Sequence, residues 1–118
     1  MNNPINQAIG AIFVPVSNLE HSRDWYCELL GVPADGEIIS GHLYVIPLQN
    51  EVSIVLDSKI FSQHVVSNAP LFHFNTNDPQ AAYQYVNERN IAIESDIQFD
   101  QFFNVKDPDG NVIMICKC

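Results

Sequence analysis

The sequence predicts an α+β domain made of two tandem βαβββ modules, whose curved mixed sheets surround a shared cleft. The chain has 118 residues, which is enough for one domain with one hydrophobic core. Its composition, 47% hydrophobic and only 16% charged, is typical of a folded chain and excludes disorder. The same order of predicted elements also occurs twice, with an offset of about sixty residues, as expected for a duplicated module.

The first module is expected in residues 1–57 of a single domain that spans 1–118. A strand over 9–16 runs into a helix, for which Ser17 and Glu20 supply the spacing of a capping box. An apolar stripe at helical spacing then ends at Gly31, a residue that suits a left-handed helix C-terminus. Three short β-rich segments complete the module: 36–40, 42–48 and 52–56.

The second module is expected in residues 70–118, after a linker over 58–69. A strand over 71–76 precedes a helix with Asp78 as N-cap and Pro79 at its first position. Asn90 takes the place of glycine at the end of this helix. Three further strands are predicted, with a Pro-Gly turn before the last of them: 91–94, 98–106 and 111–117.

Charge and composition exclude several classes of protein. With 5 basic and 14 acidic residues, a formal charge of −9, the chain lacks the basic surface that binds nucleic acid. No apolar run is long enough to span a membrane, and residues 1–4 lack the pattern of a signal peptide, so we expect a cytoplasmic protein. The odd number of cysteines, three, predicts reduced thiols at Cys27, Cys116 and Cys118. Cys116 and Cys118 share one face of the last predicted strand, and a metal or disulfide role for this pair is the alternative.

Several segments resemble the vicinal oxygen chelate superfamily of glyoxalase I, bleomycin resistance proteins and extradiol dioxygenases. They are Val-Ser-Asn-Leu-Glu-His-Ser at 16–22, Trp-Tyr at 25–26, Leu-Gly at 30–31 and Asp-Pro-Asp-Gly-Asn at 107–111. The resemblance covers essentially the whole chain and implies the fold described above. It leaves the chemistry open, because one fold hosts several unrelated functions.

In the enzymes of that superfamily, up to four side chains, usually His or Glu, hold a divalent metal that polarises substrate oxygens. The resemblance places these four positions on Ala11, Val55, Leu71 and Met114. The first three have no donor atom, and Met114 offers only a soft thioether, so none suits a hard divalent cation. We therefore expect no metal, no cofactor and no catalytic residue, and the sequence favours a protein that is not an enzyme while leaving activity open.

Strand alternation describes the cleft that remains, an apolar pocket with a few polar groups, as in many small-molecule sites. The alternative is that the same side chains simply fill a core between the sheets. His73 is the inward titratable group that we single out, either for a ligand or as a hydrogen-bonded core residue. Aromatic side chains on the flanking strands could stack on a planar ligand. The candidate ligand-binding residues are Phe13, Tyr44, Ser53, Val55, Leu71, His73, Asn75, Phe103 and Met114.

The favoured function is a metal-free small-molecule-binding protein that resembles bleomycin and glycopeptide antibiotic resistance proteins and sequesters its ligand in the cleft. The charge of −9 would favour a cationic ligand. The resemblance also implies a homodimer, because two chains of that branch commonly contribute to each cleft. One alternative is a glyoxalase- or dioxygenase-type metalloenzyme with non-standard ligands, in which His73 is joined by His42, Glu37, Asp57 or Glu94. Another is a module for protein interaction whose cleft is filled by its own side chains.

Overall fold

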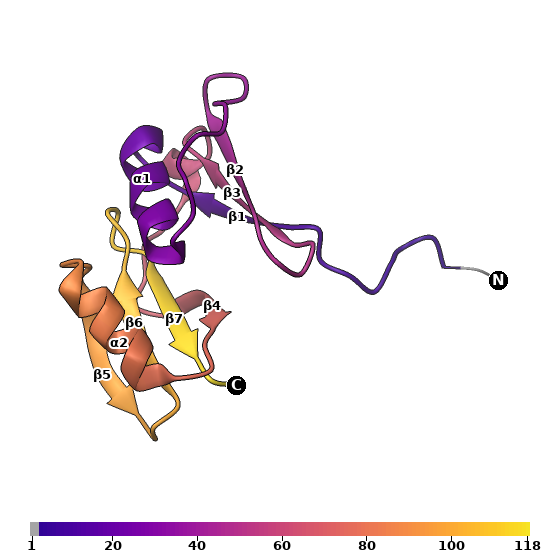
Figure 1. Ribbon diagram of the computed structural model, residues 1–118. Coiled ribbons are helices and arrows are strands. Elements are labelled where there is room, and N and C mark those ends of the chain that lie inside the picture. Colours follow the sequence, from indigo (N-terminus) through magenta and orange to yellow (C-terminus); the bar gives the residue numbers. More distant parts are fainter. Residues whose placement is uncertain (1–2) are drawn as a thin grey trace.

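The computed structural model describes residues 3–118, which form two sheets and two main helices (Figure 1). Met1 and Asn2, on which part of the signal-peptide argument depends, lie outside the described residues. Residues 3–10 extend away from the body of the protein as an arm (Figure 1). Across residues 3–118, no helix is both long and apolar enough to cross a membrane. The predicted α+β fold class is confirmed.

The first half of the chain forms a three-stranded sheet with one helix. Its sheet has the order β1-β3-β2, with β1 parallel and β2 antiparallel to the central β3. The helix α1 contacts β2 and β3 and so covers one face of the sheet. The elements are β1 (Ala11–Pro15), α1 (Leu19–Leu30), β2 (Leu43–Pro47) and β3 (Ser53–Asp57).

The strand expected over residues 36–40 does not form, and this prediction is wrong. Only Ile39 makes an isolated bridge, to Leu43. Ser40 and Gly41 both have positive φ, 53° and 74°, so the chain turns back too soon for a longer ladder. The N–H of Gly36 donates to the hydroxyl of Tyr44, at 3.1 Å, instead of to a neighbouring strand.

The second half repeats the pairing pattern and adds a fourth strand. Its sheet has the order β4-β7-β6-β5, with β4 parallel to β7 and the other pairs antiparallel. The strands β1, β3 and β2 thus correspond to β4, β7 and β6. The elements are β4 (Pro70–Asn75), α2 (Pro79–Glu88), β5 (Ile93–Gln98), β6 (Phe102–Lys106) and β7 (Val112–Cys116). The segment 58–69 joins the halves and contains the short 3-10 helix η1 (Phe61–Gln63).

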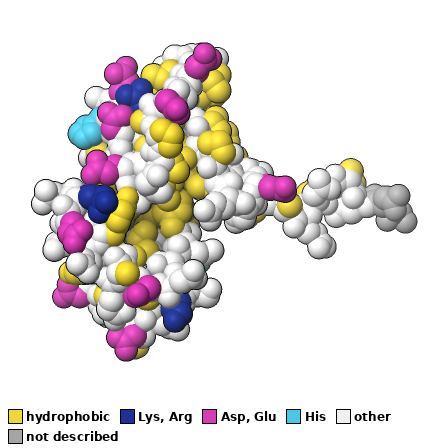
Figure 2. Space-filling model, viewed as in Figure 1, with side chains coloured by type: hydrophobic (Ala, Val, Ile, Leu, Met, Phe, Trp, Pro, Cys, Tyr) yellow, Lys and Arg dark blue, Asp and Glu magenta, His cyan; other side chains and the backbone are white. Residues whose placement is uncertain are grey.

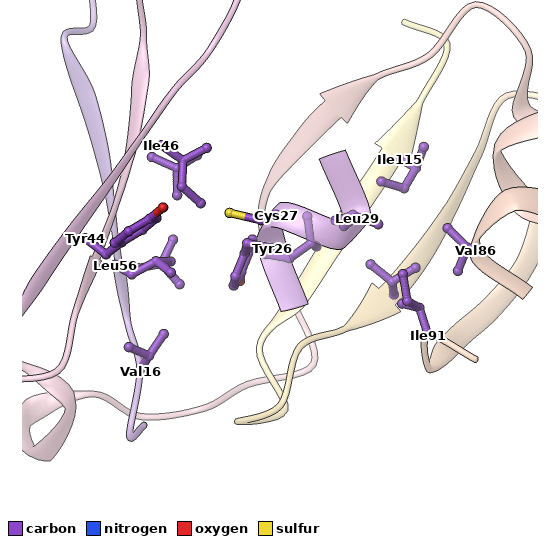
Figure 3. Close-up of a cluster of buried hydrophobic side chains, with 14 of the residues drawn as sticks. Val16, Tyr26, Cys27, Leu29, Tyr44, Ile46, Leu56, Val86, Ile91 and Ile115 are labelled. Carbon is purple, nitrogen blue, oxygen red and sulfur yellow. The ribbon is translucent and has the colours of Figure 1, made fainter. Parts of the chain in front are cut away.

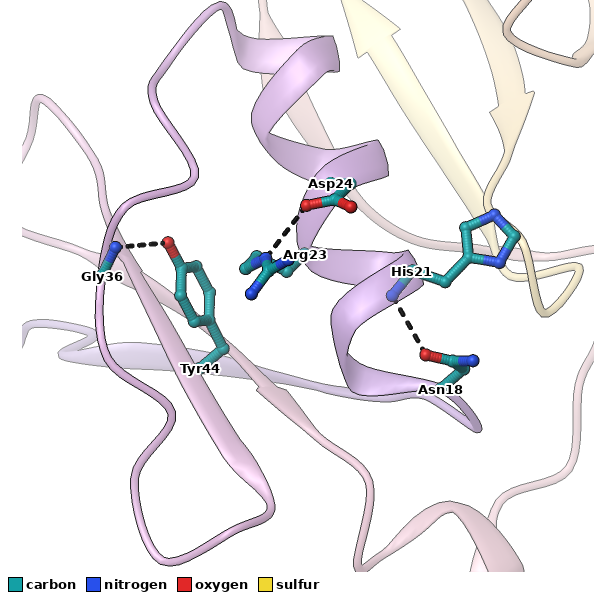
Figure 4. A network of polar contacts seen from close by, with 6 residues as sticks. All are labelled: Asn18, His21, Arg23, Asp24, Gly36 and Tyr44. Atoms are coloured by element: carbon teal, nitrogen blue, oxygen red, sulfur yellow. Dashed lines mark hydrogen bonds and ion pairs between the residues drawn. The ribbon is translucent and has the colours of Figure 1, made fainter.

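The N-terminus of α1 is capped one residue later than the sequence predicts. The side chain of Asn18 accepts a hydrogen bond from the N–H of His21, at 3.0 Å (Figure 4). Ser17, predicted as the cap, instead donates its hydroxyl to Asp109, in the turn between β6 and β7. The capping box of Ser17 and Glu20 is therefore wrong, because the serine is held by a residue 92 positions away.

The other predicted helix ends are confirmed. Asp78 caps α2 by accepting from the N–H of Ala81, at 3.1 Å, and Pro79 is the first helical residue. Gly31 ends α1 in the left-handed region, with φ of 66°. Asn90 follows α2 with φ of 56°, so it takes the conformation for which glycine is usual.

One hydrophobic core connects the two halves, and α1 lies between their sheets (Figure 3). On one side of this helix, Cys27 points toward the first sheet; on the other, Leu29 lies near Ile115 of β7 (Figure 3). Five residues of α1 are buried, compared with two of α2. The first helix therefore packs on both halves, whereas the second covers only its own sheet.

Candidate ligand-binding site

Each sheet has one face covered by a helix and another face turned away from the helices, called here its open face. Side chains such as Val14, Ile54, Leu56, Val105 and Ile113 belong to the helix-covered core. Because neighbours along a strand point to opposite faces, the residues between them form the open faces. None of these residues belongs to the core cluster: Ala11, Phe13, Ser53 and Val55 in the first sheet, and Leu71, His73, Asn75, Val112, Met114 and Cys116 in the second.

The open faces expose apolar surface to solvent. Phe13 is 55% exposed and Leu71 is 44% exposed, whereas Val55, on the central strand β3, is only 7% exposed. Phe13 and Leu71 are therefore not packed in a core between the two sheets of one chain. Exposed apolar surface of this kind, where it is contiguous, marks a face that binds a ligand or a partner.

Two predicted ligand-binding residues lie on the covered faces instead. Tyr44 is 3% exposed and faces α1, where the guanidinium of Arg23 lies 6.0 Å from its ring centre and the N–H of Gly36 donates to its hydroxyl (Figure 4). Phe103 is fully buried, with its ring 5.2 Å from that of Tyr83 on α2. The expectation that these two residues edge the cleft is wrong, because the side chains of Tyr44 on β2 and Phe103 on β6 point to the helix-covered face of their sheet and not to its open face.

A groove of about 370 Å³ lies where the two halves meet. Its walls are Leu30 and Val32 at the end of α1, residues 47–50 between β2 and β3, and residues 73–75 of β4. Figure 2 shows hydrophobic side chains gathered in the hollow in the middle of this view. The groove takes in His73 and Asn75 of the predicted set. The remaining open-face candidates lie outside its walls: Phe13, Ser53, Val55, Leu71 and Met114.

The positions that the resemblance assigns to metal ligands all lie on the open faces. Ala11 and Val55 are on the adjacent strands β1 and β3, and Leu71 and Met114 are on the adjacent strands β4 and β7. None of the four side chains has an oxygen or nitrogen donor. These residues therefore do not fit the hard divalent cation that the enzymes of the superfamily hold.

The Asp-Pro-Asp-Gly-Asn turn is a structural element that holds α1. The carboxylate of Asp107, 5% exposed, accepts from the hydroxyl of Tyr26 at 2.8 Å and from the side-chain amide of Asn111 at 2.9 Å. It also accepts from the backbone N–H groups of Asp109 and Asn111. Burial raises the pKa of Asp107, and these hydrogen bonds partly oppose the increase. Burial, followed by the charge of Asp107, raises the pKa of Tyr26 well above its ordinary value, so the phenol remains a donor.

The same turn is bonded to the first half at two more places. Asn111 donates from its side-chain amide to the carbonyl of Pro15, at 3.1 Å. Asp109 accepts from both the N–H and the hydroxyl of Ser17. His64 is half-buried, with its Nε2 2.7 Å from Oδ1 of Asn111. Sequence reasoning treated this motif as a simple turn and missed its bonds to α1 and β1, because no local pattern reports contacts this distant.

Two of the three cysteines form a disulfide, which corrects the prediction of three reduced thiols. Cys116 is the last residue of β7, and Cys118 lies two residues beyond, with their Cα atoms 5.4 Å apart. This Cα spacing lies within the range that a disulfide spans. Cys27 remains a free, buried thiol, and burial raises its pKa.

Comparisons with known proteins agree with this architecture. The family model described as Glyoxalase/Bleomycin resistance protein/Dioxygenase superfamily matches residues 8–115. Among solved structures, TnmS3, an antibiotic binding protein from Streptomyces sp. CB03234, has a TM-score of 0.76 and 26% identity, covering 98% of each chain. A glyoxalase/bleomycin resistance protein from the same organism has a TM-score of 0.70 and 26% identity, covering 92% of this chain and 99% of that one.

An enzyme also shares the fold. Lactoylglutathione lyase from Agrobacterium tumefaciens has a TM-score of 0.69 and 17% identity, covering 97% of this chain and 95% of that one. A comparison with curated proteins gave no match. Since the family model spans both halves and the join between them, the chain belongs to the Glyoxalase/Bleomycin resistance protein/Dioxygenase superfamily.

Proposed function

We propose that this protein binds and sequesters a small molecule on the open faces of its sheets, without transforming it. The observation that carries this proposal is the exposed apolar surface of those faces, chiefly Phe13 and Leu71, in a fold whose helices cover only the opposite faces. Two similar structures, one named as an antibiotic binding protein and one as a glyoxalase/bleomycin resistance protein, support it. We therefore propose an antibiotic as the ligand and antibiotic resistance, through sequestration in the cytoplasm, as the result.

The charge of the chain favours a ligand that carries positive charge. With 14 acidic against 5 basic side chains, the surface potential attracts cations and repels anions. Acidic side chains are spread over the face of the molecule seen in Figure 2, on both sides of the central hollow. A planar or aromatic cation would combine this attraction with apolar contact against Phe13 and Leu71.

We further propose that the binding form is a homodimer. Within one chain, Phe13 and Leu71 remain about half exposed, so neither sheet covers the open face of the other. A second copy placed over these faces would enclose a ligand between a sheet of each chain. Enclosure matters because a pocket that binds a drug-sized molecule usually buries most of its surface.

Thermal unfolding with a glycopeptide antibiotic of the bleomycin class tests the proposal. A ligand at about 100 times its Kd adds about 2.7 kcal/mol of stability, which is a rise in Tm on the order of 10 °C for a chain of this size. Phe13→Ala and Leu71→Ala should reduce the rise. Val65→Ala is the control, because Val65 is an apolar residue that is 85% exposed on the segment between the halves.

Two further outcomes decide against the proposal. Unchanged melting across a panel of cationic, neutral and anionic antibiotics would contradict sequestration of this class of ligand. Metal analysis that finds one Mn, Fe or Ni ion per purified chain, lost in His73→Ala, would support the metalloenzyme alternative instead. Sedimentation of the protein with and without ligand tests the homodimer separately.

A further inference from the structure

We infer that His73, Cys116 and Cys118 form a binding site for a thiophilic d10 cation, Cu(I) or Zn(II), when the two cysteines are reduced. One potential ligand atom from each residue lies within 4.8 Å of the other two. None of these three residues is one of the four family positions, and the site does not depend on the proposed small-molecule function.

Strand pairing brings the three residues together. In the parallel pair β4 and β7, His73 lies opposite Met114, and Asn75 lies opposite Cys116. Because side chains two apart share a face, His73 and Cys116 both point to the open face of the second sheet. Cys118 follows the end of β7, with its Cα 5.4 Å from that of Cys116. The backbone of β4 and of the end of β7 therefore keeps the three residues near one another.

The set of donors selects the class of metal ion. Two thiolates and an imidazole are the ligands that Zn(II) and Cu(I) prefer, whereas Mg²⁺ and Ca²⁺ need oxygen atoms. Bond lengths of about 2.0 to 2.3 Å around such an ion place its ligand atoms roughly 3.3 to 3.8 Å apart. In the structure the two sulfur atoms are bonded to each other, and a ring nitrogen of His73 lies within 4.8 Å of both. Reduction must therefore separate the sulfur atoms, while the imidazole moves closer to them. On the same face, Met114 adds a further soft atom, its thioether sulfur.

Solvent can reach the site, and the end of β7 holds one of its ligands in place. Cys116 is 1% exposed and held at the end of β7, while His73 and Cys118 are exposed. An ion can therefore enter from solvent and still reach one buried ligand. His73 also lines the groove between the halves, so the metal would lie at the edge of that groove.

The disulfide makes the site dependent on the redox state of the two cysteines. In the oxidised form the two sulfur atoms are bonded to each other and carry no thiolate charge. Two molecules of a small thiol, RSH, reduce it: the protein S–S bond breaks, two protein thiols form, and RSSR leaves. The metal ion then replaces the two thiol protons, which pass to solvent.

A competition titration on the full chain tests the inference. The protein is reduced with a phosphine, freed of reductant under argon, and titrated with Cu(I) against a chromophoric Cu(I) chelator, and separately with Zn(II) against a zinc indicator. We expect one ion per reduced chain with at least one of the two metals, and no stoichiometric binding by the disulfide form. Cys116→Ser, Cys118→Ser and His73→Gln should each weaken binding at least tenfold.

Cys27→Ser is the matched control, because Cys27 is a thiol buried in the helix-covered core, away from the open faces. It should leave the affinity and stoichiometry unchanged. Co(II) provides an independent signal, since thiolate ligands give an intense charge-transfer absorption that should disappear in the Cys118→Ser variant. Circular dichroism of each variant confirms folding. Absence of stoichiometric binding by the reduced protein, or equal binding by the Cys118→Ser and Cys27→Ser variants, would overturn the inference.

Discussion

The two halves of this chain have the same order of elements but use their helices differently. In the second half, α2 covers its own sheet, and only Pro79 and Val86 are buried on it. In the first half, five positions of α1 are buried, because the helix is enclosed between both sheets. The phenol of Tyr26 reaches Asp107 of the other half, and the hydroxyl of Tyr85 on α2 donates to the carbonyl of Glu28 on α1. The repeat therefore preserves the order of elements and not their packing.

The sheets differ in a related way. The second sheet has four strands, whereas the first lacks the counterpart of β5 and leaves residues 36–40 as an exposed connection. The connection is fixed by the Gly36 bond to Tyr44, whose ring packs under α1. The substitutions below test this contrast between α1, which packs against both sheets, and α2, which packs against its own sheet.

The largest effect is expected from Phe103→Ala, in the part of the core beneath α2. Phe103 is fully buried, so truncation should reduce the free energy of unfolding by about 3 to 5 kcal/mol. If the core is shared through α1, the loss should reach the first half as well. Trp25, the single tryptophan, lies on α1 and reports this by fluorescence during denaturation in guanidinium. The fluorescence and circular dichroism midpoints should fall together; an unchanged fluorescence midpoint would show that the halves unfold independently.

A smaller effect is expected from Tyr26→Phe, which removes one bond between the halves. Loss of the hydrogen bond to the buried Asp107 carboxylate should cost about 1.5 to 3 kcal/mol. Tyr83→Phe is the matched control, because its hydroxyl also donates to a carboxylate, that of Asp96, on the exposed surface of a single half. The control should lose much less stability in the same denaturation experiment. Equal losses would contradict a special role for the bond between the halves.

The same substitution changes the pH dependence of stability. Burial raises the pKa of Tyr26 above its ordinary value of 10.0, so above about pH 10 the unfolded chain loses this proton while the folded chain keeps it. The stability contributed by Tyr26 is thus fully present below that pH and is lost as the pH rises. The difference in unfolding free energy between wild type and Tyr26→Phe should shrink on passing from neutral pH to the alkaline range. A constant difference would contradict this assignment.

The smallest effects are expected at the helix caps. Asn18→Ala and Asp78→Ala each remove one side-chain acceptor at a helix N-terminus, at a cost of about 1 kcal/mol. Because α1 packs on both halves, we expect Asn18→Ala to lower the midpoint of Trp25 fluorescence and of circular dichroism equally. Ser17→Ala separates the two roles at this position: it should weaken the tie to Asp109 and leave the helix cap intact. A larger fall in helicity for Ser17→Ala than for Asn18→Ala would restore the predicted capping box.

Much of the fold could be predicted because its signals are local. The helix end at Gly31 and the cap and first residue of α2, Asp78 and Pro79, follow from backbone preferences. The open-face positions follow from the alternation of side chains once a motif fixes the register of a strand. No motif fixes β2 or β6, and there the facing of Tyr44 and Phe103 was assigned to the wrong side.

The features that the sequence did not predict are contacts between distant residues. Nothing in residues 16–22 indicates that Ser17 is held by Asp109, and nothing near His64 indicates its contact with Asn111. The disulfide between Cys116 and Cys118 was not the favoured prediction, because the odd number of cysteines pointed to reduced thiols.

The bonds made by the Asp-Pro-Asp-Gly-Asn turn also bear on the order in which the chain folds. Tyr26 and Asp107 are 81 positions apart, Ser17 and Asp109 are 92 apart, and Pro15 and Asn111 are 96 apart. Each contact closes a loop of most of the chain, and such closure must be achieved before the contacts can stabilise anything. During synthesis, β1 and α1 leave the ribosome long before the turn that secures them. We therefore expect these contacts between the halves to form late in folding, after the local structure of β1 and α1.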